Sequence, residues 1–149
     1  MPILNLSRGV KITRVMNSQA AATTDVNSST IDMANWEGVV FIAAVGALTA
    51  TQVTQIKAQQ GQLADASDMA DLAGSNTGPF ADADGNKMLV LDLYQPQERY
   101  VRCVVDRGTA NAVVDGVIAI QYGSRKAPTT HDTSVKATKF LQSPAEGTA

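Results

Sequence analysis

Hydrophobic and polar residues alternate with a period of two in several short segments, and clusters of Gly, Pro, Asn and Asp separate these segments. This pattern is typical of an all-β domain. After Lys87, leucines at every second position point to one face, and Pro96 ends the run because proline cannot donate to a strand ladder. The alternation predicts strands over 39–45, 53–60, 87–94, 100–106 and 113–122.

The same pattern predicts which residues share a face. Segment 39–45 is almost entirely apolar, which predicts a central strand covered on both faces. The runs 87–94 and 100–106 are expected to form a hairpin or a corner. The other strands group these residues on one face each: Thr54, Ile56 and Ala58; Leu89, Leu91 and Leu93; Val101, Cys103 and Val105; Val114, Gly116, Ile118, Ile120 and Tyr122.

The remaining segments are less regular. Segments 10–15 and 29–33 have the length and alternation of short strands. In 63–74, aspartates recur every three residues, which predicts one or two helical turns that Gly74 ends. The sequence from Ala127 onward is rich in Thr, Ser, Lys and Ala, which predicts an extended arm.

These elements predict one all-β domain, a β-sandwich or jelly roll with one short helix and extended N- and C-terminal arms. An open barrel is the alternative. Residues 1–27 are expected to form an N-terminal strand or arm, residues 28–126 the sandwich core, and residues 127–149 a C-terminal arm. Since uncovered sheet edges pair with other chains, the two arms are candidate covers or donated strands.

Charge and composition exclude several classes of protein. The 149 residues include 12 Lys and Arg against 14 Asp and Glu, a net charge of −2, with few aromatic residues. A nucleic-acid interface needs a concentrated basic face, so we expect no nucleic-acid partner. No apolar run approaches the roughly 18 residues of a membrane span. Arg8, Lys11 and Arg14 interrupt any signal-peptide core, so we expect a protein made in the cytoplasm.

The chain offers little for catalysis. A single Cys and a single His cannot form an internal disulfide or a structural zinc site. His131 and Asp132 are adjacent in a polar segment, where side chains point apart, and no motif places a nucleophile beside them. Cys103 is expected to be a packed core thiol. We therefore expect no enzymatic activity, no metal and no cofactor.

Two acidic segments have the composition of cation sites. Asp82–Lys87 is similar to the start of a calcium loop, but Gly85 is the fourth residue rather than the sixth, and Leu93 replaces the glutamate at the twelfth. A tight Asp-Gly turn is favoured there. The aspartates of 63–74 lack a complete ligand set and are expected to form a solvated helix face. The only tryptophan, Trp36, is expected to plug the core.

Basic residues gather in two parts of the chain, near the N-terminus and between residues 99 and 126. Solvated surface is the ordinary interpretation. A partner contact is the alternative, because arginine pairs bidentately with carboxylates and is enriched at interface hot spots. The candidate contacts are Arg8, Lys11, Arg14, Arg99, Arg102, Arg125 and Lys126.

Short strings between Ser29 and Thr130 resemble a known group of proteins. They are Asp32–Phe41, Ala58–Gly61, Asp71–Gly74, Pro96 with Arg99–Arg102, Ala119–Gly123, Arg125 and Pro128–Thr130. Together they resemble small structural proteins encoded in the head modules of tailed bacteriophages, the head decoration or cement proteins. The resemblance implies a β-sandwich or jelly-roll core and oligomers bound outside an expanded icosahedral shell.

The function implied by this resemblance is that of a virion structural protein that binds the outer capsid surface and stabilises the shell by bridging major capsid subunits. The implied partners are the major capsid protein and further copies of this chain, as a homodimer or homotrimer. A tail or baseplate component is the alternative. A carbohydrate-binding adhesion module is less favoured, because only Tyr94, Tyr100 and Tyr122 are candidates for an exposed aromatic row.

Overall fold

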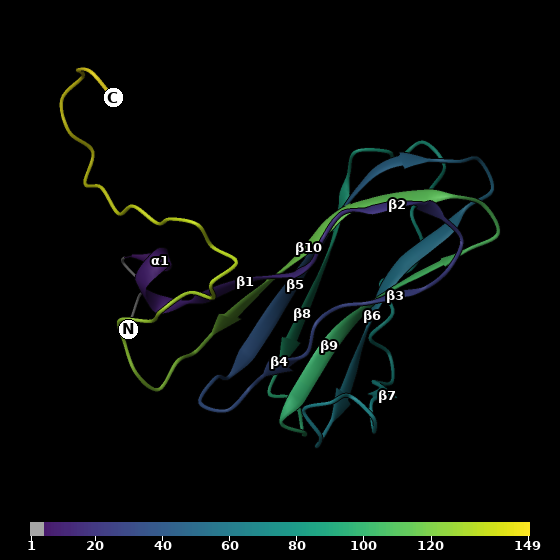
Figure 1. Cartoon of the computed structure of the whole chain (residues 1–149), viewed down its shortest axis with the longest axis horizontal. Helices are drawn as coiled ribbons and strands as arrows, with labels where there is room; N and C mark the ends of the chain where they lie inside the picture. The colour runs from purple at the N-terminus through teal and green to yellow at the C-terminus, as the bar shows by residue number, and fades with distance from the viewer. Residues whose placement is uncertain (1–4) are drawn as a thin grey trace.

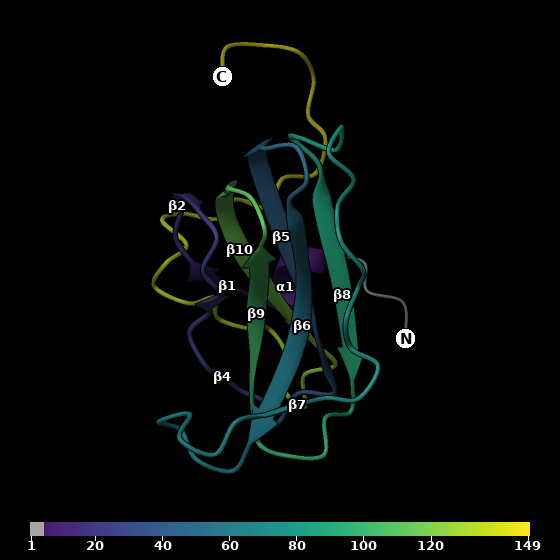
Figure 2. The ribbon, with the colours of Figure 1, turned by 90° about the vertical axis from the view of Figure 1, so that its right-hand side faces the viewer.

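Two antiparallel sheets pack face to face in the computed structural model, which describes residues 5–149 (Figures 1 and 2). The β-sandwich with one short helix is therefore confirmed. The helix, α1 (Leu6–Gly9), precedes the first strand and lies beside the C-terminal segment in Figure 1.

The first sheet, sheet A, has the order β1, β10, β5, β8, and β2 continues the line of β1 along the same edge of β10. Its strands are β1 (Lys11–Met16), β2 (Gln19–Ala22), β5 (Gly38–Leu48), β8 (Met88–Tyr94) and β10 (Ala112–Tyr122). Sheet B has the order β3, β9, β6, β7, and β4 follows β3 along β9. Its strands are β3 (Val26–Asn27), β4 (Ile31–Asp32), β6 (Val53–Gly61), β7 (Ala70–Asp71) and β9 (Tyr100–Gly108).

The hydrophobic core lies between the sheets and consists mainly of small and branched side chains. Phe41 of β5 and Ile56 of β6 are the largest hydrophobic side chains that are fully buried. The leucines of β8 and Trp36 pack partly buried against this cluster, as expected for a core plug at Trp36. Many van der Waals contacts between small side chains therefore hold the two sheets together, rather than the packing of a few aromatic rings.

The strands predicted by alternation are present as β5, β6, β8, β9 and β10. Residues 11–27, expected to form a strand or arm, supply β1, β2 and β3. Val15 and Met16 of β1 are buried in the core. The strands β8 and β9 belong to different sheets, so the segment between them is a corner rather than a hairpin turn.

The helix expected over 63–74 is wrong. This segment contains turns and the short strand β7. The Asp68 carboxylate accepts the backbone amides of Gln62 at 2.7 Å and Leu63 at 3.2 Å, and Ala66 has a φ of 63°. Aspartates that bond to nearby amides offer the backbone an alternative to the helix, which is why a helical spacing misled here.

The face predicted for 113–122 is wrong beyond Val114. The register of β10 against β5 shifts between Val114 and Gly116, where Gly116 has a φ of 151°. A bulge of this kind moves every later side chain to the opposite face. The core therefore receives Val117, Ala119 and Gln121, whereas Ile118, Ile120 and Tyr122 point outward.

Arg107 of β9 links the two sheets from inside the sandwich. The residue is only 5% exposed. Its Nε donates to the carbonyl of Thr24 at 2.7 Å, and its Nη1 donates to the carbonyls of Ala20 in β2 and Ala112 in β10, both at 2.9 Å. The Asp25 carboxylate accepts the backbone amide of Arg107 at 3.0 Å. One guanidinium thus donates to three carbonyls, in β2, in β10 and in the loop before β3.

Replacing Arg107 with Met should lower the free energy of unfolding by about 2–4 kcal/mol, because three carbonyls lose charge-assisted donors. Urea denaturation measures this loss. The matched control is Arg102→Met, since Arg102 is half-buried on the outer face and its Nε donates only to Gln59; its change should stay near about 0.5 kcal/mol. Equal losses in the two variants would contradict the structural role of Arg107.

Candidate interaction surface

The outer face of sheet B is a hydrogen-bonded polar surface. The Asp71 carboxylate accepts from Nζ of Lys57 at 2.8 Å and from Nε2 of Gln59 at 2.7 Å. Gln59 in turn accepts from Nε of Arg102 at 2.7 Å. The hydrogen bond from Lys57 is the main reason that the pKa of Asp71 lies below its ordinary value. These groups satisfy one another, as on an ordinary solvated face.

The outer face of sheet A is apolar instead. The strand registers place Arg14, Ile118, Ile42 and Val90 in one row across β1, β10, β5 and β8, and Ile12, Ile120, Val40 and Asp92 in the next. Several of these side chains are well exposed: Met88 at 61%, Tyr94 at 59%, Val90 at 56% and Ile118 at 42%. We define the apolar face as Ile12, Val40, Ile42, Ala44, Met88, Val90, Tyr94, Ile118 and Ile120.

This finding corrects the expectation that β5 is covered on both faces. Its inner residues are buried in the core, but Val40, Ile42 and Ala44 are only half-buried, and no second layer of strands covers them among residues 5–149. The unbroken apolar run of 39–45 was therefore the sequence signal of an apolar outer surface. A strand buried on both faces has the same composition, so the sequence alone does not separate the two cases.

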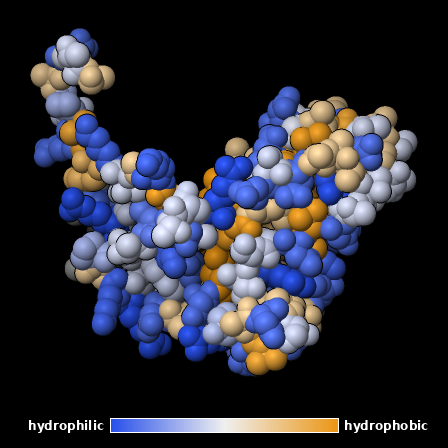
Figure 3. Space-filling model, in the orientation of Figure 1, coloured by the Kyte–Doolittle hydropathy of each residue, from blue (hydrophilic) through white to orange (hydrophobic). Residues whose placement is uncertain are grey.

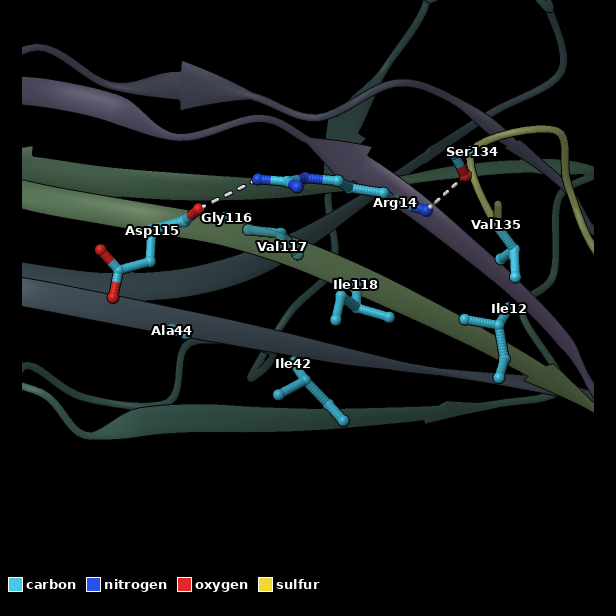
Figure 4. Close-up of a pocket in the computed structure, with 10 residues that line it drawn as sticks. All are labelled: Ile12, Arg14, Ile42, Ala44, Asp115, Gly116, Val117, Ile118, Ser134 and Val135. Atoms are coloured by element: carbon cyan, nitrogen blue, oxygen red, sulfur yellow. Dashed lines mark hydrogen bonds between the residues drawn. The ribbon is translucent and has the colours of Figure 1, made fainter. Parts of the chain in front are cut away.

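A groove of about 370 Å³ crosses the apolar face beside β1 (Figure 4). Ile42, Ile118 and Ile12 line it from three strands, and Val135 borders it from the C-terminal segment. Hydrophobic residues gather in the hollow between this segment and the sandwich in Figure 3. The apolar walls favour contact with another apolar surface.

The Arg14 side chain lies along the border of this groove. Its Nη2 donates to the carbonyl of Asp115 at 3.3 Å. A Cβ at Gly116 would lie 3.3 Å from Nη2 of Arg14 and 3.0 Å from the carbonyl oxygen of Met16. Glycine at the bulge therefore gives the guanidinium room to lie against β10.

The C-terminal segment covers the edge of β1. His131 Nδ1 accepts the amide of Ile12 at 3.0 Å, and Asp132 donates its own amide to the Ile12 carbonyl at 3.2 Å. The Ser134 hydroxyl accepts the Arg14 amide at 2.9 Å, and the Thr129 hydroxyl donates to the carbonyl of Val10. We name residues 129–134 the edge latch. Beyond it, residues 136–149 are exposed.

The predicted basic contacts do not form one patch. Arg8 lies 5.1 Å from the Phe140 ring centroid, Arg14 borders the groove, and Lys11 stands between them in β1. The remaining four lie elsewhere in the fold: Arg99, Arg102, Arg125 and Lys126. Of all seven, Arg14 alone lines the groove on the apolar face.

Arg99 and Arg125 meet at one end of the sandwich, where they line a cavity of about 530 Å³ together with Trp36. Arg99 pairs bidentately with Asp32, at 3.0 Å from Nε and 2.8 Å from Nη2. This contact holds the pKa of Asp32 below its ordinary value. Lys126 is exposed in the turn that follows β10. An Arg99 already paired within its own chain has less capacity to bind a partner carboxylate.

The residues that could take part in catalysis or bind a metal ion have structural roles instead. His131 belongs to the edge latch, and Cys103 is fully buried in β9. The Asp82–Lys87 segment forms a turn as expected, with Asn86 rather than Gly85 at positive φ. Within residues 5–149, no three His, Cys, Asp or Glu side chains are grouped so as to hold a metal ion. No helix in the described part of the chain is long and apolar enough to cross a membrane.

The expectation that the C-terminal arm covers a sheet edge agrees with the latch on β1. The sequence did not indicate which strand it covers or which side chains make the contacts, because nothing in a polar tail marks them. The comparisons with known proteins add no assignment: no protein family model matches the chain, and no curated protein sequence matches it.

Removal of residues 129–149 should accelerate hydrogen exchange at the amides of Ile12 and Arg14 by about tenfold or more, because each loses its acceptor in the latch. Mass spectrometry or NMR measures this exchange. The amides of Lys11 and Thr13 are the internal control, since alternation in the ladder directs them toward β10. Uniform acceleration along β1 would instead indicate loss of the whole strand.

Cys103 should be inert in the folded protein. Burial raises the pKa of its thiol to about 12, so almost no thiolate exists near neutral pH. A chromogenic disulfide reagent at pH 8 should react with one thiol per chain only after denaturant is added. Rapid reaction without denaturant would show that β9 opens.

Proposed function

We propose that this protein is a structural protein of a tailed bacteriophage that binds the outer capsid surface and stabilises the shell by bridging major capsid subunits. Its partners in this role are the major capsid protein and further copies of itself, as a homodimer or homotrimer. The observation that carries the proposal is the apolar face of sheet A, and the resemblance of the sequence strings to decoration proteins supplies the choice of partner.

The composition and shape of the apolar face support docking. A soluble protein rarely exposes a large contiguous apolar surface to water, and such a surface usually marks a contact site for a partner. Four neighbouring strands form this face, so it is broad enough to pack against a broad surface of a partner. Burial of Ile42, Ile118 and Val90 would provide the binding free energy, since apolar area removed from water is the main favourable term. Arg14 at the border offers a guanidinium for a carboxylate of the partner.

The exposed C-terminal residues support a second contact. Phe140 and Leu141 are 47% and 59% exposed and form the only large apolar pair beyond the latch. Two weak contacts joined by one chain bind far more tightly than either does alone, because the second contact is intramolecular. A cement role needs this kind of durable attachment and needs no catalytic group.

Co-sedimentation of the purified protein with expanded shells that lack it tests the proposal. We expect saturable binding at a fixed ratio to the capsid subunit and a higher melting temperature of the shells, because a ligand that binds only the assembled state stabilises it. Failure to bind shells, together with recovery on tails, would overturn the capsid role and favour a tail component.

A matched pair of variants locates the contact. Ile118→Asp places a charge on the apolar face and should weaken shell binding by about tenfold or more, a loss of about 1.4 kcal/mol or more. Val53→Asp is the control, because Val53 is 41% exposed against 42% for Ile118 but lies in β6 of sheet B. Equal weakening by both variants would contradict docking through the apolar face.

A further inference from the structure

Segments outside the regular ladders cover one edge of each sheet. The latch covers β1, as described above. The edge of β6 is covered by residues 72–80: Leu72 and Thr77 donate their amides to the carbonyls of Ala58 and Ile56, and the Ser75 hydroxyl accepts the Ala58 amide at 3.0 Å. Side-chain hydroxyls and backbone groups thus replace a regular neighbouring strand at both positions.

The outer edge of β8 has no such cover. Lys87 accepts the amide of Val45, and Gln95 donates to the carbonyl of Glu37, so the odd-numbered residues of this line bond toward β5. By alternation, the amides and carbonyls of the even-numbered residues point away from the sheet. They are Met88, Val90, Asp92 and Tyr94. Within residues 5–149, β8 pairs only with β5, and no side chain bonds to these backbone groups.

The strand also lacks the features that usually protect an edge. Its register with β5 is continuous from Met88 to Tyr94, without a bulge. No proline or lysine lies within it, and its only charge is Asp92, whose carboxylate accepts from the Tyr122 hydroxyl at 2.6 Å. Regular, apolar and unpaired edges associate with other strands.

We propose that β8 pairs antiparallel with β8 of a second copy, about a two-fold axis at Leu91. In this register Met88 lies opposite Tyr94 of the second copy, and Val90 lies opposite Asp92. All four even-numbered residues of each strand then sit in hydrogen-bonded positions, and each facing pair exchanges two bonds. The same surface serves both copies, as a two-fold interface requires.

Charge and shape favour this register over its neighbours. A shift of the axis from Leu91 to Asp92 would oppose the two Asp92 carboxylates and leave Met88 unpaired, whereas a shift to Val90 would leave Tyr94 unpaired. With the axis at Leu91, no like charges stand directly opposite, and the thioether of Met88 meets the ring of Tyr94. On the inner side, Leu91 and Leu93 border a cavity of about 520 Å³, whose other walls are residues 72–75 and 95–97 of the same chain.

This inference does not depend on the proposed capsid role. It concerns the chain alone, so its tests use only the purified full-length protein. Shell binding can fail while the β8 pairing holds, and the reverse is also possible, because the Ile118 test lies on β10 and the tests below lie on β8.

Cysteine crosslinking tests the register directly. Residues 91 of the two copies face each other at a non-hydrogen-bonded position, where Cα atoms lie about 4.5 Å apart, within disulfide range. Leu91→Cys should therefore form a disulfide dimer under mild oxidation. Leu89→Cys and Leu93→Cys should not crosslink when alone, but should crosslink when mixed. The parent chain is the control, since its buried Cys103 should not react.

Sedimentation equilibrium tests the pairing itself. The parent protein should sediment with the mass of two chains. The Val90→Pro variant should sediment with the mass of one chain, because the Val90 amide faces the open edge and makes no hydrogen bond to β5. An unchanged far-ultraviolet circular dichroism spectrum checks that the Val90→Pro fold is intact. A monomeric parent chain at the highest soluble concentration would overturn the proposal. So would a Leu91→Cys chain that stays uncrosslinked while Leu89→Cys alone crosslinks.

Discussion

Unpaired backbone at sheet edges is the constraint on which this structure depends. An edge strand presents amides and carbonyls that need water or a partner, and a sandwich has several such edges. This chain satisfies two of them with irregular segments: the latch on β1, through His131 and Ser134, and residues 72–80 on β6. Both segments use side-chain acceptors where a strand would use carbonyls. The outer edge of β8, a regular strand of seven residues, has no such cover.

The two outer faces follow from the same alternation but have opposite chemistry. On sheet B, Lys57, Gln59 and Asp71 bond to one another, and water can complete their remaining bonds. On sheet A, the corresponding positions carry Ile, Val and Met, which water solvates poorly. The hydrophobic core of the domain lies between the inner faces. The apolar residues on the outer face are the observation that supports the proposed docking, because exposed apolar surfaces of this kind usually mark contact sites.

The strands could be predicted from the sequence because the alternation of apolar and polar residues is a local pattern that does not depend on which strands pair. The sequence did not allow the bulge at Gly116 to be predicted, and one inserted residue was enough to reverse the face of Ile118 and Ile120. It also gave the aspartates of 63–74 a helical spacing, although Asp68 bonds to local amides instead. The role of Arg107 depends on three carbonyls that are distant along the chain or across the sandwich. Local sequence patterns do not indicate such long-range contacts.

The bulge and the open edge have a joint consequence for how copies can present the apolar face. A two-fold axis that relates two β8 strands in one sheet stands perpendicular to that sheet, so both apolar faces lie on the same side of the pair. Because the bulge turns Ile118 and Ile120 outward, each copy adds its own groove and its own Arg14 to that side. The grooves are lined by β1, β10 and β5 and by no residue of β8, so the shared edge does not cover them. Pairing through β8 therefore leaves both grooves accessible and would double the surface that one partner assembly can bind, which is the geometry that multivalent attachment requires.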